Sequence, residues 1–339
     1  MEILVLGGTV FLGRHVVAAA LARGHTVTLF NRGLHNAELF PGLERLRGDR
    51  NGDVHALAGR RFDAVIDLSG YAPPHMTHVA RALGEHIEHY VFVSTVSVYE
   101  SFAPWLVFTE EAALASGTAG YGPLKARAEE TIQALYPDRV THVRPGLIVG
   151  PHDPTERFTY WPRRFARAAQ EGTERGARAV VLAPGRAERP IQYIDARDLA
   201  GWCVELCLTR KAGYFNATTP AGATTMGQLI NACNQASSAS ASVHWIDDAT
   251  LVRESVQAWT ELPVWIPETD DAFGGMMLAD SHQAMDAGLT FRPLDDTVRA
   301  TLEWSQMNPI AGQTNPTNER MRAKTLSPER ENALIFAHT

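Results

Sequence analysis

Short apolar runs alternate with longer amphipathic stretches along the first half of the chain. The apolar runs lie at residues 3–6, 26–30, 64–68, 90–93 and 141–146, and the stretches between them that suit helices lie at 14–23, 75–86 and 123–135. Short strands alternating with helices are typical of a parallel sheet covered on both faces, whose strands are apolar along nearly their whole length. The pattern predicts an α/β fold with a Rossmann-type doubly wound parallel sheet.

Beyond residue 150 the pattern is less regular, and it predicts a smaller second lobe. We expect residues 1–150 to form a dinucleotide-binding domain, 151–178 a lobe insertion, 179–218 a return to the Rossmann sheet, and 219–306 the substrate-binding lobe. The lobe would close over the carboxyl ends of the strands, where open α/β sheets bind ligands. Residues 307–339, rich in Asn, Pro, Thr and Gln, predict a flexible tail in which 328–337 can form a last helix.

Composition narrows the class of protein. The 339 residues, of which 45% are hydrophobic and 20% charged, can bury a sizeable globular core. A net charge of −7 without a long basic run argues against a nucleic-acid partner. The first strand begins at residue 3 and no apolar run reaches membrane-spanning length, so we expect a cytoplasmic protein. The three cysteines form no C-x-x-C pair, which predicts buried thiols and no metal site.

The turn after the first strand carries the first candidate chemistry. Residues 7–13 read Gly-Gly-Thr-Val-Phe-Leu-Gly and lead into an alanine-rich helix and a second strand. Glycine lets the backbone approach a pyrophosphate, and a helix N-terminus offers free N–H groups, so this order predicts dinucleotide binding. Val10 replaces the middle glycine of G-x-x-G-x-x-G, and an ordinary strand-to-helix turn is the alternative. The predicted contacts here are Gly7, Thr9, Val10, Phe11, Leu12 and Gly13.

A second candidate group is Tyr121 and Lys125, downstream of a hydroxyl-containing stretch at 94–99. Four residues of spacing place Tyr121 and Lys125 on one face of a helix. A phenol has an ordinary pKa near 10, and a neighbouring ammonium favours the phenolate. With a hydroxyl at the end of the preceding strand, these side chains would form a proton relay beside a hydride carrier. A chance Y-x-x-x-K pair at an exposed helix start is the alternative.

These motifs resemble those of the extended, somewhat atypical short-chain dehydrogenase/reductases, in the NAD-dependent epimerase/dehydratase group. The resemblance covers about residues 1–305 and rests on the glycine turn, Gly48-Asp49, Val93-Ser94-Thr95, Tyr121 with Lys125, 143–146 with Gly150-Pro151, and 189–195. It implies that Thr95 is the catalytic hydroxyl, Tyr121 the acid/base, and Lys125 its helper on the nicotinamide ribose.

The resemblance also implies contacts along the rest of the cofactor. Asp49 and Arg50 would face the adenine; the remaining contacts would be Leu68, Ser69 and Gly70 along the cofactor, and Pro145 and Gly146 beside the nicotinamide. Arg189 lies where sugar-nucleotide members place an arginine on the substrate diphosphate, and a structural ion pair is the alternative. Ser97 and Trp161 are further candidates for substrate contact. Trp161 belongs to an aromatic stretch, 158–161, that either lines a pocket or packs the lobe.

The second strand ends differently from that of the NAD-preferring relatives, which carry an acid for the adenosine ribose. Here the pair is Asn31-Arg32. A carboxylate would repel a 2′-phosphate, whereas a guanidinium binds one well. The pair predicts NADP(H) as the preferred cofactor, with NAD(H) as the alternative and adenine stacking as another role for Arg32.

These residues leave three functions to weigh. Val96 and Ser97 replace the Asp-Glu pair of sugar-nucleotide 4,6-dehydratases, which argues against dehydration. The leading prediction is an NADP(H)-dependent oxidoreductase acting on a carbonyl or imine of a small metabolite. A nucleotide-sugar epimerase with tightly bound NAD is the second. A non-catalytic cofactor- or RNA-binding protein is the third, because the glycine turn also resembles that of a subgroup that includes stem-loop RNA-binding proteins. Relatives often form homodimers through helices flanking the sheet.

Overall fold

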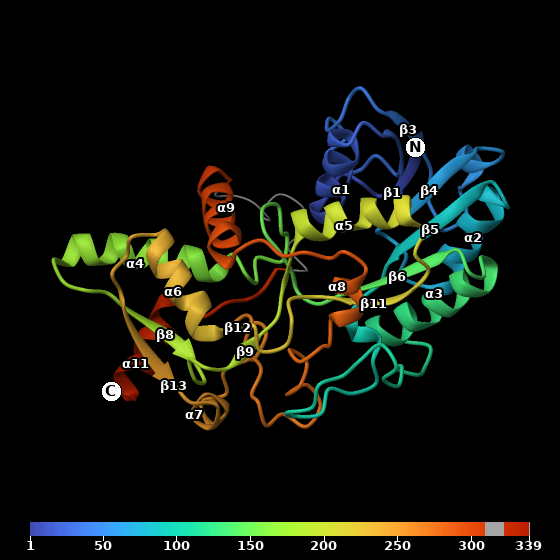
Figure 1. Cartoon of the computed structure of the whole chain (residues 1–339). Helices are drawn as coiled ribbons and strands as arrows, with labels where there is room; N and C mark the ends of the chain where they lie inside the picture. The colour runs from blue at the N-terminus through green and yellow to red at the C-terminus, as the bar shows by residue number, and fades with distance from the viewer. Residues whose placement is uncertain (309–321, 339) are drawn as a thin grey trace.

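The computed structural model describes residues 1–308 and 322–338, and its first part is built on one parallel sheet (Figure 1). Seven strands follow the order β3-β2-β1-β4-β5-β6-β11, and each neighbouring pair is parallel. Their bounds are β1 Glu2–Leu6, β2 Thr26–Asn31, β3 Glu44–Arg47, β4 Phe62–Asp67, β5 Ile87–Val93, β6 Val140–Pro145 and β11 Gly213–Ala217. The predicted doubly wound Rossmann-type sheet is therefore confirmed.

Helices cover both faces of this sheet (Figure 1). Helix α1 (Phe11–Ala22) packs against α5 (Ala196–Thr209) on one face, and α2 (Pro73–Leu83) packs against α3 (Tyr121–Leu135) on the other. Two separate clusters of buried apolar residues fill the two layers between sheet and helices. Short 3-10 helices, η1 (His55–Leu57) and η2 (Val96–Val98), lie in the connections. With both faces covered, the carboxyl ends of the strands are left to bind ligands.

The second lobe is the left half of Figure 1 and has a core of its own, with Trp161 and Trp265 fully buried in it. Its elements are α4 Tyr160–Arg175, β8 Val180–Pro184, α6 Met226–Ala236, β13 Ser242–Ile246, α7 Asp248–Arg253, α9 Leu294–Met307 and α11 Pro328–Ala337. Two pairs of two-residue strands and one short helix complete the described chain: β7 Ile148–Val149 with β10 Ile194–Asp195, β9 Pro190–Ile191 with β12 Thr224–Thr225, and α8 His282–Asp286.

One predicted boundary between the lobes is wrong. Residues 179–218 do not all return to the Rossmann sheet, because β8 pairs in parallel with β13 inside the second lobe. Only α5 and β11 return, with β11 pairing with β6 at the edge of the large sheet. An apolar run such as Val180-Val181-Leu182 predicts a buried strand but does not show which sheet it joins.

The end of the chain also differs from the expected flexible tail. The helix considered for 328–337 is present as α11, and Glu331 and Leu334 on it are buried. Ala323 and Leu326 ahead of it are buried as well. Residues 322–338 are thus packed against the second lobe, while 309–321 and 339 lie outside the described residues.

Two further features bear on predictions from the sequence: the state of the three thiols and the length of the apolar helices. Cys203, Cys207 and Cys233 are buried and free, and burial raises the pKa of all three thiols. Within residues 1–308 and 322–338, no helix has both the length and the apolar character needed to cross a bilayer.

Candidate active site

The glycine turn brings β1 close to the first turn of α1. Gly7 and Gly8 both have positive φ, 117° and 92°, which side chains rarely adopt. A side-chain carbon on Gly13 would lie 2.7 Å from the Cα of Gly8, so this helix can approach the turn only with glycine there. Val10 is the extended N-cap of α1, with φ −111° and ψ −167°, a conformation that valine adopts readily. The valine is therefore compatible with the turn.

The start of α1 fits a pyrophosphate. Val10 makes no side-chain capping bond. The first turn of α1, which starts with Phe11 and Leu12, contains no acidic residue. Uncapped N–H groups at the N-terminus of a twelve-residue helix form a site for an anion. Thr9, which is buried, accepts a hydrogen bond at its carbonyl from Asn36 Nδ2 at 2.6 Å, and this bond holds the turn in place.

Asn31 and Arg32, at the end of β2, have different surroundings. The Asn31 amide donates to the Gly7 carbonyl at 2.9 Å and accepts from the Gly33 N–H at 2.9 Å. The Asn31 side chain therefore joins β2 to the glycine turn. This role differs from the contact with the cofactor that was predicted for Asn31. Arg32 is exposed and makes no hydrogen bond or ion pair with a residue in the described part of the chain.

Arg50, which was predicted to face the adenine, has its guanidinium bound to protein partners. Its guanidinium forms a bidentate ion pair with the buried Asp67, at 2.7 and 2.8 Å, and also donates to Ser69 Oγ at 2.9 Å. The pKa of Asp67 is held at about 2, because the charge and hydrogen bonds of Arg50 outweigh the effect of burial. The Tyr90 hydroxyl donates to the same carboxylate at 2.7 Å. Through its bonds to Asp67 and Ser69, Arg50 therefore fixes the start of the 68–70 segment.

Asp49 lies in a tight turn at the same edge of the sheet. Its backbone pairs with Asp53, and its carboxylate accepts from the Asn51 N–H at 2.9 Å. Leu68 donates from its N–H to the Leu6 carbonyl, which keeps the 68–70 segment beside the glycine turn. Ser69 and Gly70, which were predicted to lie along the cofactor, are thus adjacent to the glycine turn.

Tyr121 and Thr95 meet at the carboxyl edge of the sheet. Thr95 follows β5 and Tyr121 begins α3, and the Thr95 hydroxyl lies near enough to that of Tyr121 to act on its pKa. The approach depends on Gly122, because a side-chain carbon there would lie 2.1 Å from the Ser97 carbonyl oxygen. Ser97 itself donates its N–H to Thr95 Oγ1 at 3.1 Å, which fixes the Thr95 rotamer.

The environment of Tyr121 makes it a weak acid. Burial around the hydroxyl raises its pKa to about 12, the neighbouring Tyr71 acts in the same direction, and the hydrogen bond from Thr95 acts against them. The ring is still accessible, with 53% of the residue exposed. A protonated, accessible phenol at neutral pH is suited to donate a proton.

Lys125 is close to this pair but is directed elsewhere. Its ammonium donates to the carbonyls of Gly70 at 2.7 Å and Val93 at 2.8 Å, and it lies 4.2 Å from the centre of the Phe92 ring. Burial lowers its pKa to about 7. The expectation that Lys125 lowers the pKa of Tyr121 is not met in this geometry, where the hydrogen bond to Thr95 has that effect.

Tyr71 is a residue of this site that the sequence analysis missed. Its ring centre is 6.3 Å from that of Tyr121 and 5.5 Å from the Lys125 ammonium, and half of the residue is exposed. The signal available in the sequence was its position directly after Ser69-Gly70, at the end of a central strand. Two phenols therefore border the same opening.

Little space surrounds Gly146, a residue that was expected to lie beside the nicotinamide. Gly146 follows Pro145 at the end of β6, and a side-chain carbon on it would lie 2.9 Å from Thr218 Oγ1. Gly146 also lines a cavity of about 10 Å³, large enough for about one water molecule. The other residues around the cavity are Val96, Leu147, Gln192, Thr218, Trp259, Met276, Met277 and Ala279. Its lining is mostly apolar.

Trp161 does not line a substrate pocket. The residue is fully buried in the core of the second lobe, and its indole N–H donates to the Pro263 carbonyl at 2.9 Å. Phe158 beside it is fully buried as well. The alternative, that this aromatic stretch packs the lobe, is the one that the structure has. The sequence could not distinguish them, because both readings need large apolar side chains there.

Arg189 is buried without a full set of partners. Only 2% of the residue is exposed, and its Nε and Nη1 atoms make no hydrogen bond within the described residues. Asp248, Glu268 and Arg186 are close enough to act on its charge, but burial dominates and lowers its pKa. The structural ion pair considered for Arg189 is not formed with any described residue, and the guanidinium retains donors for an anion.

The fold and the site together define the class of protein. Residues 3–216, more than half of the chain, match the model of the NAD dependent epimerase/dehydratase family. The chain belongs to this family, as the glycine turn and the Thr95, Tyr121 and Lys125 set predicted.

Individual relatives are more distant. The chain is 30% identical over 179 residues to the chloroplast stem-loop binding protein of 41 kDa b of Arabidopsis thaliana, a match that spans 47% of this chain and 46% of the relative. The chain thus spans about half the length of that relative.

Solved structures, among them two UDP-glucose 4-epimerases, share the fold over most of this chain. The Thermotoga maritima UDP-glucose 4-epimerase with UDP-glucose is 17% identical, with a TM-score of 0.64 over 91% of this chain and 100% of its own. The Bordetella bronchiseptica enzyme WbmH in complex with NAD+ is 16% identical, with a TM-score of 0.63 over 90% and 98%. The Thermus thermophilus UDP-glucose 4-epimerase complex with NAD is 18% identical, with a TM-score of 0.63 over 90% and 99%.

Proposed function

We propose that the protein is an NADP(H)-dependent oxidoreductase that transfers hydride between the nicotinamide and a carbonyl or imine carbon of a small metabolite. The observation that carries the proposal is the juxtaposition of Thr95 and Tyr121 at the carboxyl edge of a sheet whose glycine turn fits a dinucleotide. The exposed Arg32, and the absence of a carboxylate at the end of β2, support the phosphorylated cofactor.

Each residue has a distinct task in this proposal. The bound nicotinamide supplies or accepts the hydride at its C4 atom. Thr95 holds the substrate oxygen or nitrogen, and Tyr121 donates a proton to it as the carbonyl is reduced. The phenol of Tyr121 is protonated at neutral pH and can act as the donor, and its raised pKa makes it a weaker acid than an ordinary tyrosine. Lys125, held on the Gly70 and Val93 carbonyls, positions the ribose side of the cofactor cleft.

Replacing Tyr121 by phenylalanine tests the proposal. Tyr121→Phe removes the proton donor and keeps the ring, so turnover on a panel of aldehydes, ketones and imines with NADPH should fall by about 100-fold or more. Binding of NADPH, followed by its fluorescence, should change by less than about twofold, since the phenol acts on the substrate. Tyr214→Phe is the matched control, because Tyr214 lies on β11 and stacks on His142 away from the site. Near-normal turnover of Tyr121→Phe would remove Tyr121 from the mechanism.

A nucleotide-sugar epimerase is the second candidate, and Arg189 is the observation in its favour. A buried guanidinium with two unpaired nitrogens suits a diphosphate. The T. maritima and T. thermophilus relatives are UDP-glucose 4-epimerases, and the latter structure contains NAD. An epimerase regenerates its cofactor in each cycle, so the purified protein would carry NAD+ and convert a UDP-sugar without added cofactor. Tighter binding of NAD(H) than of NADP(H) would favour this candidate over the reductase.

A non-catalytic RNA-binding protein is the third candidate, supported by the name of the A. thaliana relative. The net charge of −7 and the presence of Thr95, Tyr121 and Lys125 count against it. Salt-sensitive binding to a stem-loop RNA, together with no turnover on the substrate panel, would make it the preferred function. We propose a small-molecule partner and no nucleic-acid or membrane partner. We also propose a homodimer through the helices that flank the sheet.

A further inference from the structure

The ends of β2 and β3 place a second arginine beside Arg32. Strands β2 and β3 are parallel neighbours, and Asn31 is paired with Arg47 in their register. A side-chain carbon built on Gly33 would lie 3.3 Å from the guanidinium carbon of Arg47, so this guanidinium rests against the backbone that directly follows Arg32. Cationic residues thus lie at the ends of two neighbouring strands, at the carboxyl edge of the sheet.

Neither arginine has a protein anion to neutralise it. Arg32 and Arg47 are exposed, and within residues 1–308 and 322–338 neither side chain forms an ion pair or a hydrogen bond. The acid nearest to Arg47 along the chain, Asp49, accepts instead from the Asn51 N–H. Carboxylates elsewhere in this part of the sheet are already paired: Glu44 on β3 binds Arg60, and Asp67 on β4 binds Arg50. Two like charges held together without a counter-charge favour an anionic ligand.

The hydrogen bonds of Asn31 indicate which anion Arg32 and Arg47 can bind. In dinucleotide-binding folds a side-chain oxygen at this strand end accepts from the ribose 2′-hydroxyl. The Asn31 oxygen already accepts from the Gly33 N–H, and its amide donates to Gly7, so neither group is directed at a ribose. We propose that Arg32 and Arg47 together bind a 2′-phosphate on the adenosine ribose, and that Arg47 is a specificity-determining residue for NADP(H). This inference rests on the proposed cofactor and assigns a site for its distinguishing phosphate.

Two nucleotides that differ by only this phosphate test the assignment. Adenosine 2′,5′-bisphosphate and adenosine 5′-monophosphate are titrated by calorimetry into the full-length wild-type protein, Arg47→Ala, Arg47→Lys and Arg32→Ala. The wild type should bind the bisphosphate about tenfold more tightly, and Arg47→Ala should lose about tenfold for the bisphosphate alone. Arg47→Lys keeps the charge without the forked geometry and should lose less. Arg61→Ala is the matched control, because Arg61 is exposed and directly precedes β4, at the amino edge of the sheet.

The outcomes separate the assignment from the cofactor proposal. Equal weakening of both nucleotides by Arg47→Ala, or no weakening of either, would overturn the role of Arg47. If the wild type bound both nucleotides equally, a 2′-phosphate site would be excluded, while hydride transfer with NAD(H) would stand. If the wild type bound neither nucleotide, the dinucleotide proposal itself would fail, and this inference with it. Circular dichroism of each variant confirms that a loss of affinity does not come from unfolding.

Discussion

Among single residues, Lys125 has the environment with the clearest consequence for stability. Its ammonium is buried on two carbonyls, and burial lowers its pKa from 10.5 to about 7. Between those pH values the unfolded chain holds a proton that the folded chain has released. The free energy of unfolding should therefore rise with pH across this window, by about 1 kcal/mol per pH unit, and be independent of this group below it.

The variant Lys125→Met isolates this effect, because methionine fills similar space and does not titrate. Relative to Lys125→Met, the wild type should gain about 2 kcal/mol of unfolding free energy from pH 7 to pH 9. Guanidinium denaturation at pH 6, 7, 8 and 9 measures the difference. Lys211→Met, at an exposed lysine, controls for the loss of one positive charge. A difference that stays constant with pH would mean that Lys125 remains charged when folded.

The sequence predicted those residues of the candidate site that are close along the chain or belong to a motif. Tyr121 and Lys125 share a helix face through their spacing, and Thr95 follows a strand that was readily recognised. The position of the Arg50 side chain could not be predicted. Its partner Asp67 lies 17 residues away in the sequence, on β4, and both residues are polar. Side-chain direction at a strand end depends on contacts across the sheet, which a single sequence does not record.

At the scale of elements, α11 is held to the second lobe by one buried carboxylate. Glu331 accepts from Arg164 Nε at 2.7 and 2.8 Å, from Arg167 at 2.9 Å and from the Leu182 N–H at 3.1 Å. Glu331→Gln would remove the closer of two counter-charges of the buried Arg164 and leave Glu171 at 3.6 Å, so we expect a loss of about 2 kcal/mol in unfolding free energy. Chemical denaturation measures it. Glu329→Gln, on the exposed first turn of α11, should be nearly neutral, and equal stability of the two variants would contradict the prediction.

The elements that the sequence misplaced share a physical reason. Apolar periodicity predicted the large sheet because those strands are buried on both faces and alternate with helices. It assigned β8 to the wrong sheet because parallel pairing with β13 joins segments about sixty residues apart, and the same apolar run fits either sheet. The polar composition of the last residues suggested a tail, whereas Glu331 makes a polar segment part of the core.

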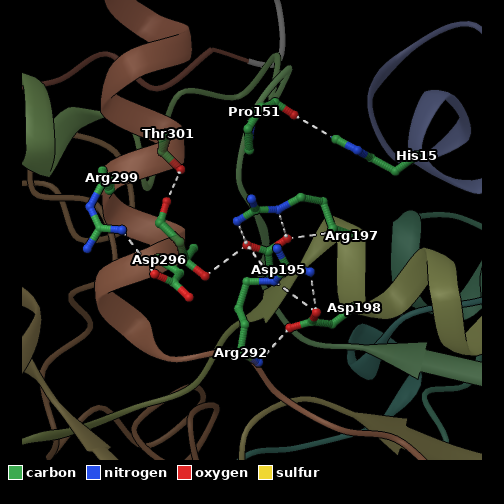
Figure 2. A network of polar contacts seen from close by, with 10 residues as sticks. His15, Pro151, Asp195, Arg197, Asp198, Arg292, Asp296, Arg299 and Thr301 are labelled. Atoms are coloured by element: carbon green, nitrogen blue, oxygen red, sulfur yellow. Dashed lines mark hydrogen bonds and ion pairs between the residues drawn. The ribbon is translucent and has the colours of Figure 1, made fainter. Parts of the chain in front are cut away.

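For the whole molecule, the relation between the two lobes depends on a polar network around Asp195 (Figure 2). Asp195 ends β10 and caps α5, and its carboxylate accepts from Arg197 at 2.7 Å and from Thr297 of α9 at 2.8 Å. Arg292, ahead of α9, donates to Asp198 of α5 at 2.6 Å. The loop after β7 is held to α1 by a hydrogen bond from His15 to the Pro151 carbonyl. The network therefore joins the Rossmann helices to the second lobe.

Asp195→Asn separates the charge of this junction from its role as a helix cap, because asparagine is also a good N-cap. Hydrogen bonds from Arg197 lower the pKa of Asp195 against the effect of burial, so its stabilisation is present above the ordinary pKa of 3.8 and is lost as the pH falls through the lower folded value. At pH 7 we expect Asp195→Asn to be less stable by about 2 kcal/mol. The difference should shrink below about pH 4.

Hydrogen exchange shows whether this loss acts on the junction. Thr297 belongs to α9, so the amides of α9 should exchange faster in Asp195→Asn, while those of β2 and β3 keep their protection because these strands lie at the sheet edge opposite β11. Asp296→Asn is the matched control, since Asp296 is exposed on the same helix and pairs only with Arg299 among the described residues. Uniform acceleration in both lobes would mean that Asp195 stabilises the molecule globally and does not set the relation between its lobes.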